Sequence, residues 1–246
     1  MYFSKSNYIA ACYWEKGRRK INQDSLALWQ LKKGKREQIF AIVCDGIGGL
    51  PEGENASGYV VRQTIAWFIS AGYGIRKIKY RICGLQQIFF QMHEELKEYG
   101  KEKGIGLGTT ATFVWLEDGN YLWGHIGDSR LYHLGGRRVR QITEDHTLSS
   151  GALGRAVGAG EWQPLSVGAG RLRRGEGLLI CSDGFYRNIR WTDRELSMGT
   201  DMEEEQKVLR RLQQLGERKL EQGERDNLSA VYCGRIRKKR NKGEGV

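Results

Sequence analysis

The sequence has no apolar run long enough to cross a lipid bilayer. Apolar stretches such as Ile39–Cys44 and Leu178–Cys181 have only the length of single strands. The first twenty residues also lack the long apolar segment of a secretory signal peptide. These absences argue against a membrane-embedded or exported protein, and they predict a cytoplasmic location.

Paired cysteine motifs are also missing. The five cysteines lie far apart, no two are in C-x-x-C spacing, and three of them sit inside apolar, strand-like runs. Buried free thiols are the natural interpretation. An odd number of cysteines without an export signal again indicates a reducing compartment.

Proline is scarce, and neither a linker nor a repeat divides the chain. Only two prolines occur among the 246 residues. A chain of this length fits one large domain or at most two small ones. Hydrophobic residues make up 39% of the sequence, which is enough for a sizeable core. We expect a monomer.

Positive charge is in excess and is concentrated at the C-terminus. The formal net charge is +11, and the last twelve residues carry six basic side chains against Glu244 alone. Such a tail could meet nucleic acid, an anionic membrane surface or an acidic partner, or it could be a solvated, disordered end. No aromatic residues are interleaved with these charges, so we expect no specific nucleic-acid partner.

Hydrophobic periodicity predicts an α+β protein. Apolar alternation predicts early strands, the last two joined as a hairpin, and a later antiparallel run of four strands. Two helices are predicted between them, from the apolar faces Val60–Phe68 and Leu85–Tyr99. A third helix carries a buried stripe over 208–215, and Asp201 with Glu204 forms a capping box before it. The predicted strands are Tyr8–Trp14, Ser25–Leu31, Gln38–Cys44, Thr110–Leu116, Tyr121–Ile126, Arg130–Leu134, Arg138–Ile142, Leu178–Cys181 and Leu228–Ile236. This order favours packed antiparallel sheets flanked by helices.

Acidic residues recur at the ends of the predicted strands. Asp45 and Asp183 each follow an apolar strand and precede a glycine, Asp24 and Asp226 come just before strands, and Asp128 lies between two strands. A carboxylate beside a buried strand is costly unless something compensates its charge. Several carboxylates without histidine or cysteine partners suit a hard, oxygen-seeking cation such as Mg²⁺ or Mn²⁺. One Asp-Gly pair alone is more often an ordinary turn.

The ordered set of motifs resembles the protein phosphatase 2C-like (PPM) family of metal-dependent serine/threonine phosphatases, in its compact bacterial form. The resemblance runs from about Tyr8 to Ile236, so we assign residues 1–236 to the catalytic domain and 237–246 to a basic, disordered tail. The motifs that carry it are Arg19-x-x-Asn22-Gln23-Asp24, Val43–Gly49, Gly108–Thr112, Gly124–Arg130, Thr143–His146, Cys181–Gly184 and Arg225–Asn227. The resemblance implies a four-layer α-β-β-α sandwich with two central antiparallel sheets and a metal centre in the cleft between them.

The resemblance also implies roles for individual residues. Asp45 would bridge two Mg²⁺ or Mn²⁺ ions with the carbonyl of Gly46 beside it, and Asp24, Asp183 and Asp226 would complete the ligands, some through water. Arg19 resembles the family's phosphate-binding arginine, although on charge alone it is one more cation in the basic run 16–20.

Some roles stay open at the level of sequence. Asp128 and Asp183 match carboxylates that hold a third metal in some bacterial relatives, and a turn stabilised by Asp128 is the alternative. Gln23 stands where an acidic residue is common. His146 is expected to support its loop, and His125 to lie within a strand rather than bind metal.

Two departures from the family pattern concern chemistry and specificity. Ile47 replaces the histidine that serves some eukaryotic relatives as general acid. The segment 146–158 is shorter than the flap that usually borders the active site, so the cleft should be more open.

The resulting hypothesis is a phosphatase that acts on phosphoserine and phosphothreonine and opposes a cytoplasmic protein kinase. A pseudophosphatase acting as a binding module is the alternative, although such proteins usually lose metal carboxylates. A phosphatase restricted to anti-sigma-factor antagonists is a narrower possibility.

Overall fold

The computed structural model describes residues 6–48, 50–135, 138–187 and 205–237. The predicted capping box at Asp201 and Glu204, and all of the basic tail except Arg237, lie outside these residues.

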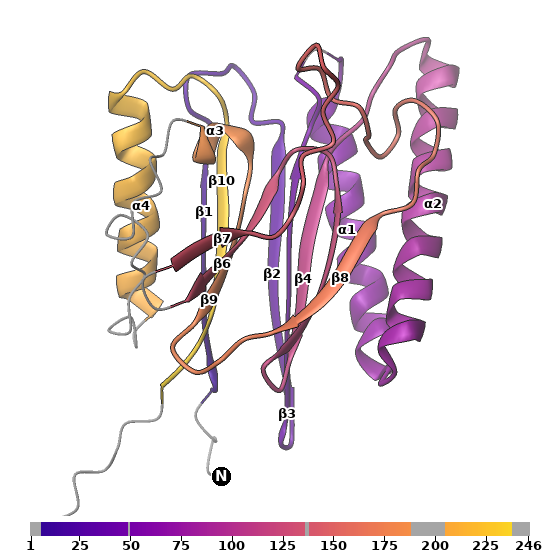
Figure 1. Ribbon diagram of the computed structural model, residues 1–246. Coiled ribbons are helices and arrows are strands. Elements are labelled where there is room, and N and C mark those ends of the chain that lie inside the picture. Colours follow the sequence, from indigo (N-terminus) through magenta and orange to yellow (C-terminus); the bar gives the residue numbers. More distant parts are fainter. Residues whose placement is uncertain (1–5, 49, 136–137, 188–204, 238–246) are drawn as a thin grey trace, which may run out of the picture.

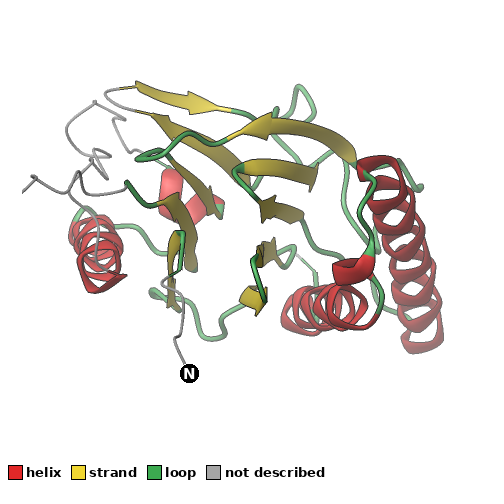
Figure 2. Ribbon diagram, turned by 90° about the horizontal axis from the view of Figure 1, so that it is seen from below, coloured by secondary structure: helices red, strands yellow, loops and turns green. Residues whose placement is uncertain are grey.

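Four layers make up the structure, as predicted (Figure 1). Two five-stranded antiparallel sheets form the middle, in the orders β1-β10-β9-β6-β7 and β2-β3-β4-β5-β8. Helix α4 (Glu205–Glu221) covers the first sheet, and α1 (Gly53–Ser70) and α2 (Ile78–Lys103) cover the second, which is also visible end-on in Figure 2. The strands are β1 (Tyr8–Glu15), β2 (Asp24–Lys33), β3 (Arg36–Asp45), β4 (Ala111–Glu117), β5 (Asn120–Ile126), β6 (Arg130–Gly135), β7 (Arg138–Gln141), β8 (Ser166–Arg171), β9 (Gly177–Cys181) and β10 (Leu228–Arg235).

The predicted hairpin of β2 and β3 sets the register of the second sheet. The two strands pair from Lys33 opposite Arg36 to Asp24 opposite Asp45. Strand β3 is buried along most of its length because it is covered by helices on one face and by the other sheet on the opposite face. Because both faces of β3 are covered, its residues form a continuous apolar run.

The outermost parts of the described chain are joined in the first sheet. Strand β1 pairs with β10 along its full length, from Tyr8 opposite Arg235 to Glu15 opposite Leu228. Helix α4 packs its predicted apolar stripe on this sheet, where Val208, Leu212 and Leu215 are buried. The chain from β1 to β10 is therefore one packed unit.

The predicted antiparallel run after α2 is divided between the two sheets. Strand β5 belongs to the second sheet and β6 to the first, and residues 127–129 cross from one to the other. Gly127 adopts a φ of 110°, which favours glycine at this crossing. Local alternation could not indicate the change of sheet, because both strands are apolar.

Three elements of the described chain were absent from the sequence-based prediction, namely strand β8, the short 3-10 helix η1 (Gly72–Gly74) and the one-turn helix α3 (Asp183–Tyr186). Strand β8 has no apolar alternation because it includes Gly168 and Gly170. The side chains of Trp123 and Tyr121 fill the space where Cβ atoms would stand at these two positions. The neighbouring strand thus supplies the packing that β8 itself lacks.

No helix in the described ranges is long and apolar enough to span a membrane. The five cysteines are all free thiols, and Cys44, Cys181 and Cys233 are buried as predicted.

Glu117, at the end of β4 remote from the acidic motifs, holds a charged network together. It forms ion pairs with Arg36 and with Arg81. The Arg81 side chain is only 8% exposed, and its Cζ atom lies 4.1 Å from the centroid of the Trp115 ring. Burial alone would raise the pKa of Glu117, but the two arginines outweigh it and lower the pKa to about 2.

We predict that Glu117→Gln destabilises the protein by about 2 kcal/mol at pH 7, because it leaves the buried Arg81 cation without its ionic partner. The folded-state pKa lies below the unfolded value, so this contribution is present above pH 4.5 and is lost as the pH falls toward 2. Urea unfolding at pH 7 and pH 3 measures it, with the exposed Glu98→Gln as control. Equal losses at both pH values would contradict the assignment.

Candidate active site

Asp24 and Asp45 face each other at one end of the second sheet. The β2–β3 register pairs them directly. Asp24 is 2% exposed, and its Oδ1 atom is buried without a hydrogen-bond partner. Strand pairing alone therefore brings two of the predicted acidic residues together.

Asp183 and Asp226 come from the first sheet. Asp183 begins α3 directly after β9, and Asp226 precedes β10, the neighbour of β9. Ser182, which precedes Asp183, connects the two sheets because its Oγ atom donates a hydrogen bond to Asp24 Oδ2 at 2.8 Å. The same Oγ atom accepts a hydrogen bond from Ser229 N of β10 at 3.0 Å. The acidic residues therefore gather where the ends of the two sheets meet.

Both Asp-Gly pairs require glycine because other backbone segments pass close by. A Cβ atom on Gly46 would lie 2.4 Å from the carbonyl oxygen of Gly53, and one on Gly184 would lie 2.2 Å from that of Asn227. The glycines thus allow the ends of β3 and β9 to pack against neighbouring backbone.

Two threonines fix the backbone of Asp45. Thr110 Oγ1 accepts a hydrogen bond from Asp45 N at 2.9 Å, and Thr109 Oγ1 donates one to Asp45 O at the same distance. Thr110 N also donates to Asp45 O at 2.8 Å. The Gly108–Thr112 motif, quoted above without a role, therefore positions Asp45.

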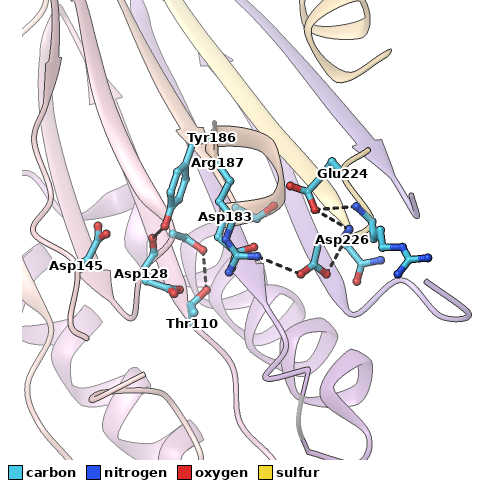
Figure 3. Close-up of polar contacts among 12 residues, drawn as sticks. Thr110, Asp128, Asp145, Asp183, Tyr186, Arg187, Glu224 and Asp226 are labelled. Atoms are coloured by element: carbon cyan, nitrogen blue, oxygen red, sulfur yellow. Dashed lines mark hydrogen bonds and ion pairs between the residues drawn. The ribbon is translucent and has the colours of Figure 1, made fainter. Parts of the chain in front are cut away.

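Asp226 is held by two arginines, shown in part in Figure 3. Arg19 donates to both carboxylate oxygens of Asp226, at 2.9 and 2.8 Å. Arg187 Nη1 lies 3.6 Å from Asp226 Oδ2, and Arg187 Nη2 pairs with Asp183 Oδ2. Arg187 is missing from the sequence-based set, and its position four residues after Asp183, one helical turn on, is the signal that could have found it.

Asp128 lies beside this group at the crossing between the sheets. Its carbonyl oxygen accepts a hydrogen bond from the Tyr186 hydroxyl at 3.0 Å, so α3 and the crossing loop are tied together. Burial raises the pKa of the Asp128 carboxyl group, and Asp145 adds to the increase. The contact between α3 and the crossing loop therefore uses the backbone of Asp128 and not its carboxylate.

The two histidines have structural contacts, as expected. His125 is buried, and its ring nitrogens contact Thr112 Oγ1 at 2.8 Å and Glu144 O at 3.0 Å. His146 Nδ1 accepts a hydrogen bond from Gly127 N at 3.0 Å, and its ring stacks on His125. Burial lowers the pKa of His125 to about 3 and that of His146 to about 4, so both rings are neutral at pH 7.

The gathered carboxylates raise one another's pKa values. Burial is the largest cause for Asp45, and the charges of Asp24 and Asp183 raise its pKa further. The pKa of Asp24 is raised by burial despite the hydrogen bond from the Ser182 hydroxyl, and that of Asp183 is raised by burial despite Arg187. Each carboxylate is therefore short of positive charge in this structure.

The donor set fits a hard divalent cation. Within the described residues, no group of three or more Asp, Glu, His or Cys side chains stands close enough together to hold a metal ion. The unpartnered Oδ1 of Asp24 and the raised carboxylate pKa values nevertheless mark a place where a cation would be stabilising. Oxygen ligands supplemented by water are the coordination that Mg²⁺ and Mn²⁺ prefer.

We predict that Asp45→Asn stabilises the metal-free protein by about 1–2 kcal/mol at pH 8, because it removes one of several repelling buried carboxylates. The carboxylate pKa values are raised in the folded state, so the stability of the wild type falls as the pH rises through them. Thermal melting in EDTA at pH 6 and pH 8 tests this, with Glu102→Gln as an exposed control. A lower melting temperature for Asp45→Asn would contradict it.

Comparison with known proteins gives matches along most of the chain. The protein phosphatase 2C family model matches residues 16–231. The serine/threonine phosphatase stp of Listeria welshimeri is 26% identical over 211 residues, which cover 74% of this chain and 79% of that protein. The protein phosphatase PhpP of Streptococcus pneumoniae is 25% identical over 134 residues, 54% of this chain, and this match spans about half of that relative's length, 52%.

The fold has close structural counterparts. The serine/threonine phosphatase of S. agalactiae superposes with a TM-score of 0.82 at 19% identity, over 94% of this chain and all of that one (100%). At this identity the likeness establishes the arrangement of the sheets and helices.

Proposed function

The chain belongs to the protein phosphatase 2C family, and we propose that it hydrolyses phosphoserine and phosphothreonine in proteins with the help of Mg²⁺ or Mn²⁺. The observation that carries the proposal is the meeting of Asp24, Asp45, Asp183 and Asp226 at the adjoining ends of two sheets. These side chains and the Gly46 carbonyl would hold two cations. Asp128 with Asp183 is the candidate pair for a third.

Asp45 and Arg19 have different roles in the proposed hydrolysis. When bound, a pair of divalent cations activates water for attack on phosphorus near neutral pH. Thr109 and Thr110 hold the backbone of Asp45, so its position at the end of β3 is fixed. Arg19 is the candidate phosphate anchor, since its planar guanidinium is 46% exposed and already engages two carboxylate oxygens in the way it would engage two phosphate oxygens.

The leaving group has no histidine acid at position 47, where Ile47 stands. Ile47 donates its backbone N–H to Gly108 O at 3.0 Å, which ties the loop after β3 to the segment before β4. Protonation of the leaving alkoxide therefore falls to solvent in the cleft.

The substrates we propose are phosphorylated proteins, modified by a serine/threonine kinase that this enzyme opposes. Two bacterial relatives carry phosphatase names, protein phosphatase PhpP and serine/threonine phosphatase stp. We place the catalytic domain at residues 1–236, because β1 and β10 close one packed unit, and the protein in the reducing cytoplasm, because its cysteines are unpaired thiols. A pseudophosphatase role has no support from the site, which keeps all four aspartates.

We predict that Asp183→Asn lowers hydrolysis of a phosphothreonine peptide in Mn²⁺ by roughly 100-fold or more, because an amide of the same shape is a poorer ligand for a hard cation. Steady-state phosphate release measures the loss. Asp118→Asn, at the far end of β4, is the matched control and should keep wild-type turnover. Equal rates for Asp183→Asn and wild type would refute the proposed reaction.

A second test separates the two uses of Arg19. If Arg19 anchors the substrate phosphate, Arg19→Ala raises KM for the phosphopeptide about tenfold or more, and Arg19→Lys recovers part of the loss. An unchanged KM in Arg19→Ala would show that Arg19 serves Asp226 only.

A further inference from the structure

Arg187 spans the two acidic residues that come from the first sheet. Its Nη2 atom pairs with Asp183 Oδ2, and its Nη1 atom lies 3.6 Å from Asp226 Oδ2 (Figure 3). Both carboxylates belong to the proposed ligands, so this one guanidinium sits where a cation would otherwise be needed.

The backbone of Arg187 is fixed, whereas its side chain has room to move. Arg187 N donates to Asp183 O at 2.8 Å, and Arg187 O accepts a hydrogen bond from Lys219 Nζ of helix α4. Lys219 is 4% exposed, so this anchor is part of the packed interior. The Arg187 side chain itself is 50% exposed, so it borders solvent on its outer side.

Arginine and a divalent cation exclude each other at these oxygen atoms. A guanidinium stays protonated at any pH the protein survives, so Arg187 cannot give up its charge and must move away. Like charges a few ångströms apart also repel. A cation that binds Oδ2 of Asp183 and Oδ2 of Asp226 must therefore replace the Arg187 contacts.

We propose that Arg187 is a displaceable internal counter-ion, which neutralises Asp183 and Asp226 in the metal-free protein and lowers their affinity for divalent cations. The inference rests on the proposed function, because it takes these two carboxylates as metal ligands. Arg187 is a positioning residue in this scheme and not a catalytic one. Arg19 differs from it, because Arg19 contacts Asp226 alone and is the candidate phosphate anchor.

Calorimetric titration of the full chain with Mn²⁺ tests the inference without reference to turnover. We expect Arg187→Ala and Arg187→Gln to bind Mn²⁺ about threefold to tenfold more tightly than wild type. The gain is modest because the lost ion pairs are partly exposed and therefore weak. Arg187→Lys keeps the charge on a shorter reach and should fall between wild type and Arg187→Ala. Arg210→Ala removes one exposed positive charge from α4 and should bind like wild type.

Melting of the metal-free protein supplies an independent measurement. In EDTA, Arg187→Ala should melt below wild type because its carboxylates lose their counter-ion, and saturating Mn²⁺ should raise its melting temperature by more than it raises that of wild type. Unchanged or weaker Mn²⁺ binding by Arg187→Ala and Arg187→Gln would overturn the inference. Failure of the wild type to bind Mn²⁺ at all would instead overturn the proposed metal site, and with it the role of Arg187.

Discussion

Mutual repulsion among Asp24, Asp45, Asp183 and Asp226 is the constraint around which this end of the molecule is built. The four carboxylates come from two different sheets and gather where the sheet ends meet. Burial and like charge raise the pKa values of three of them, so the arrangement opposes folding locally. It persists because the two apolar sheets, packed face to face and covered by helices, stabilise the fold around it.

The surrounding residues reduce this repulsion in distinct ways. Ser182 gives Asp24 a hydrogen bond from the opposite sheet, and Thr109 and Thr110 hold the backbone of Asp45. Arg19 and Arg187 supply positive charge to Asp226 and Asp183. The carboxylate repulsion that remains would be offset by the divalent cations proposed for this site.

The two ends of the structure use charge differently. At the remote end of β4, Glu117 is satisfied by Arg36 and the buried Arg81, so that network stabilises the fold. At the site end the acidic residues exceed the bases near them, which leaves room for an external cation. The same residue types thus serve stability at one end and the proposed chemistry at the other.

The fold class and most of the acidic residues at the site could be predicted from local patterns in the sequence. Local alternation and helical periodicity depend on neighbouring residues, so they located nine of the ten strands and the three long helices in the described part of the chain, and the ordered Asp motifs indicated a cation site. Strand β8 was not predicted because its own sequence lacks apolar alternation. Tyr121 and Trp123 of the adjacent strand pack over its glycines instead. The change of sheet at residues 127–129 was not predicted because strand pairing depends on residues far apart in the chain.

The balance of charges at the site depends instead on contacts made in the folded protein. Arg187 reaches Asp183 within one helical turn, but its approach to Asp226 and its anchoring by Lys219 depend on β10 and α4 packing beside β9. Likewise, Ser182 meets Asp24 only because the two sheets stack with their ends aligned. Contacts between residues far apart in the chain depend on the relative placement of whole sheets and helices, and no local pattern encodes that placement.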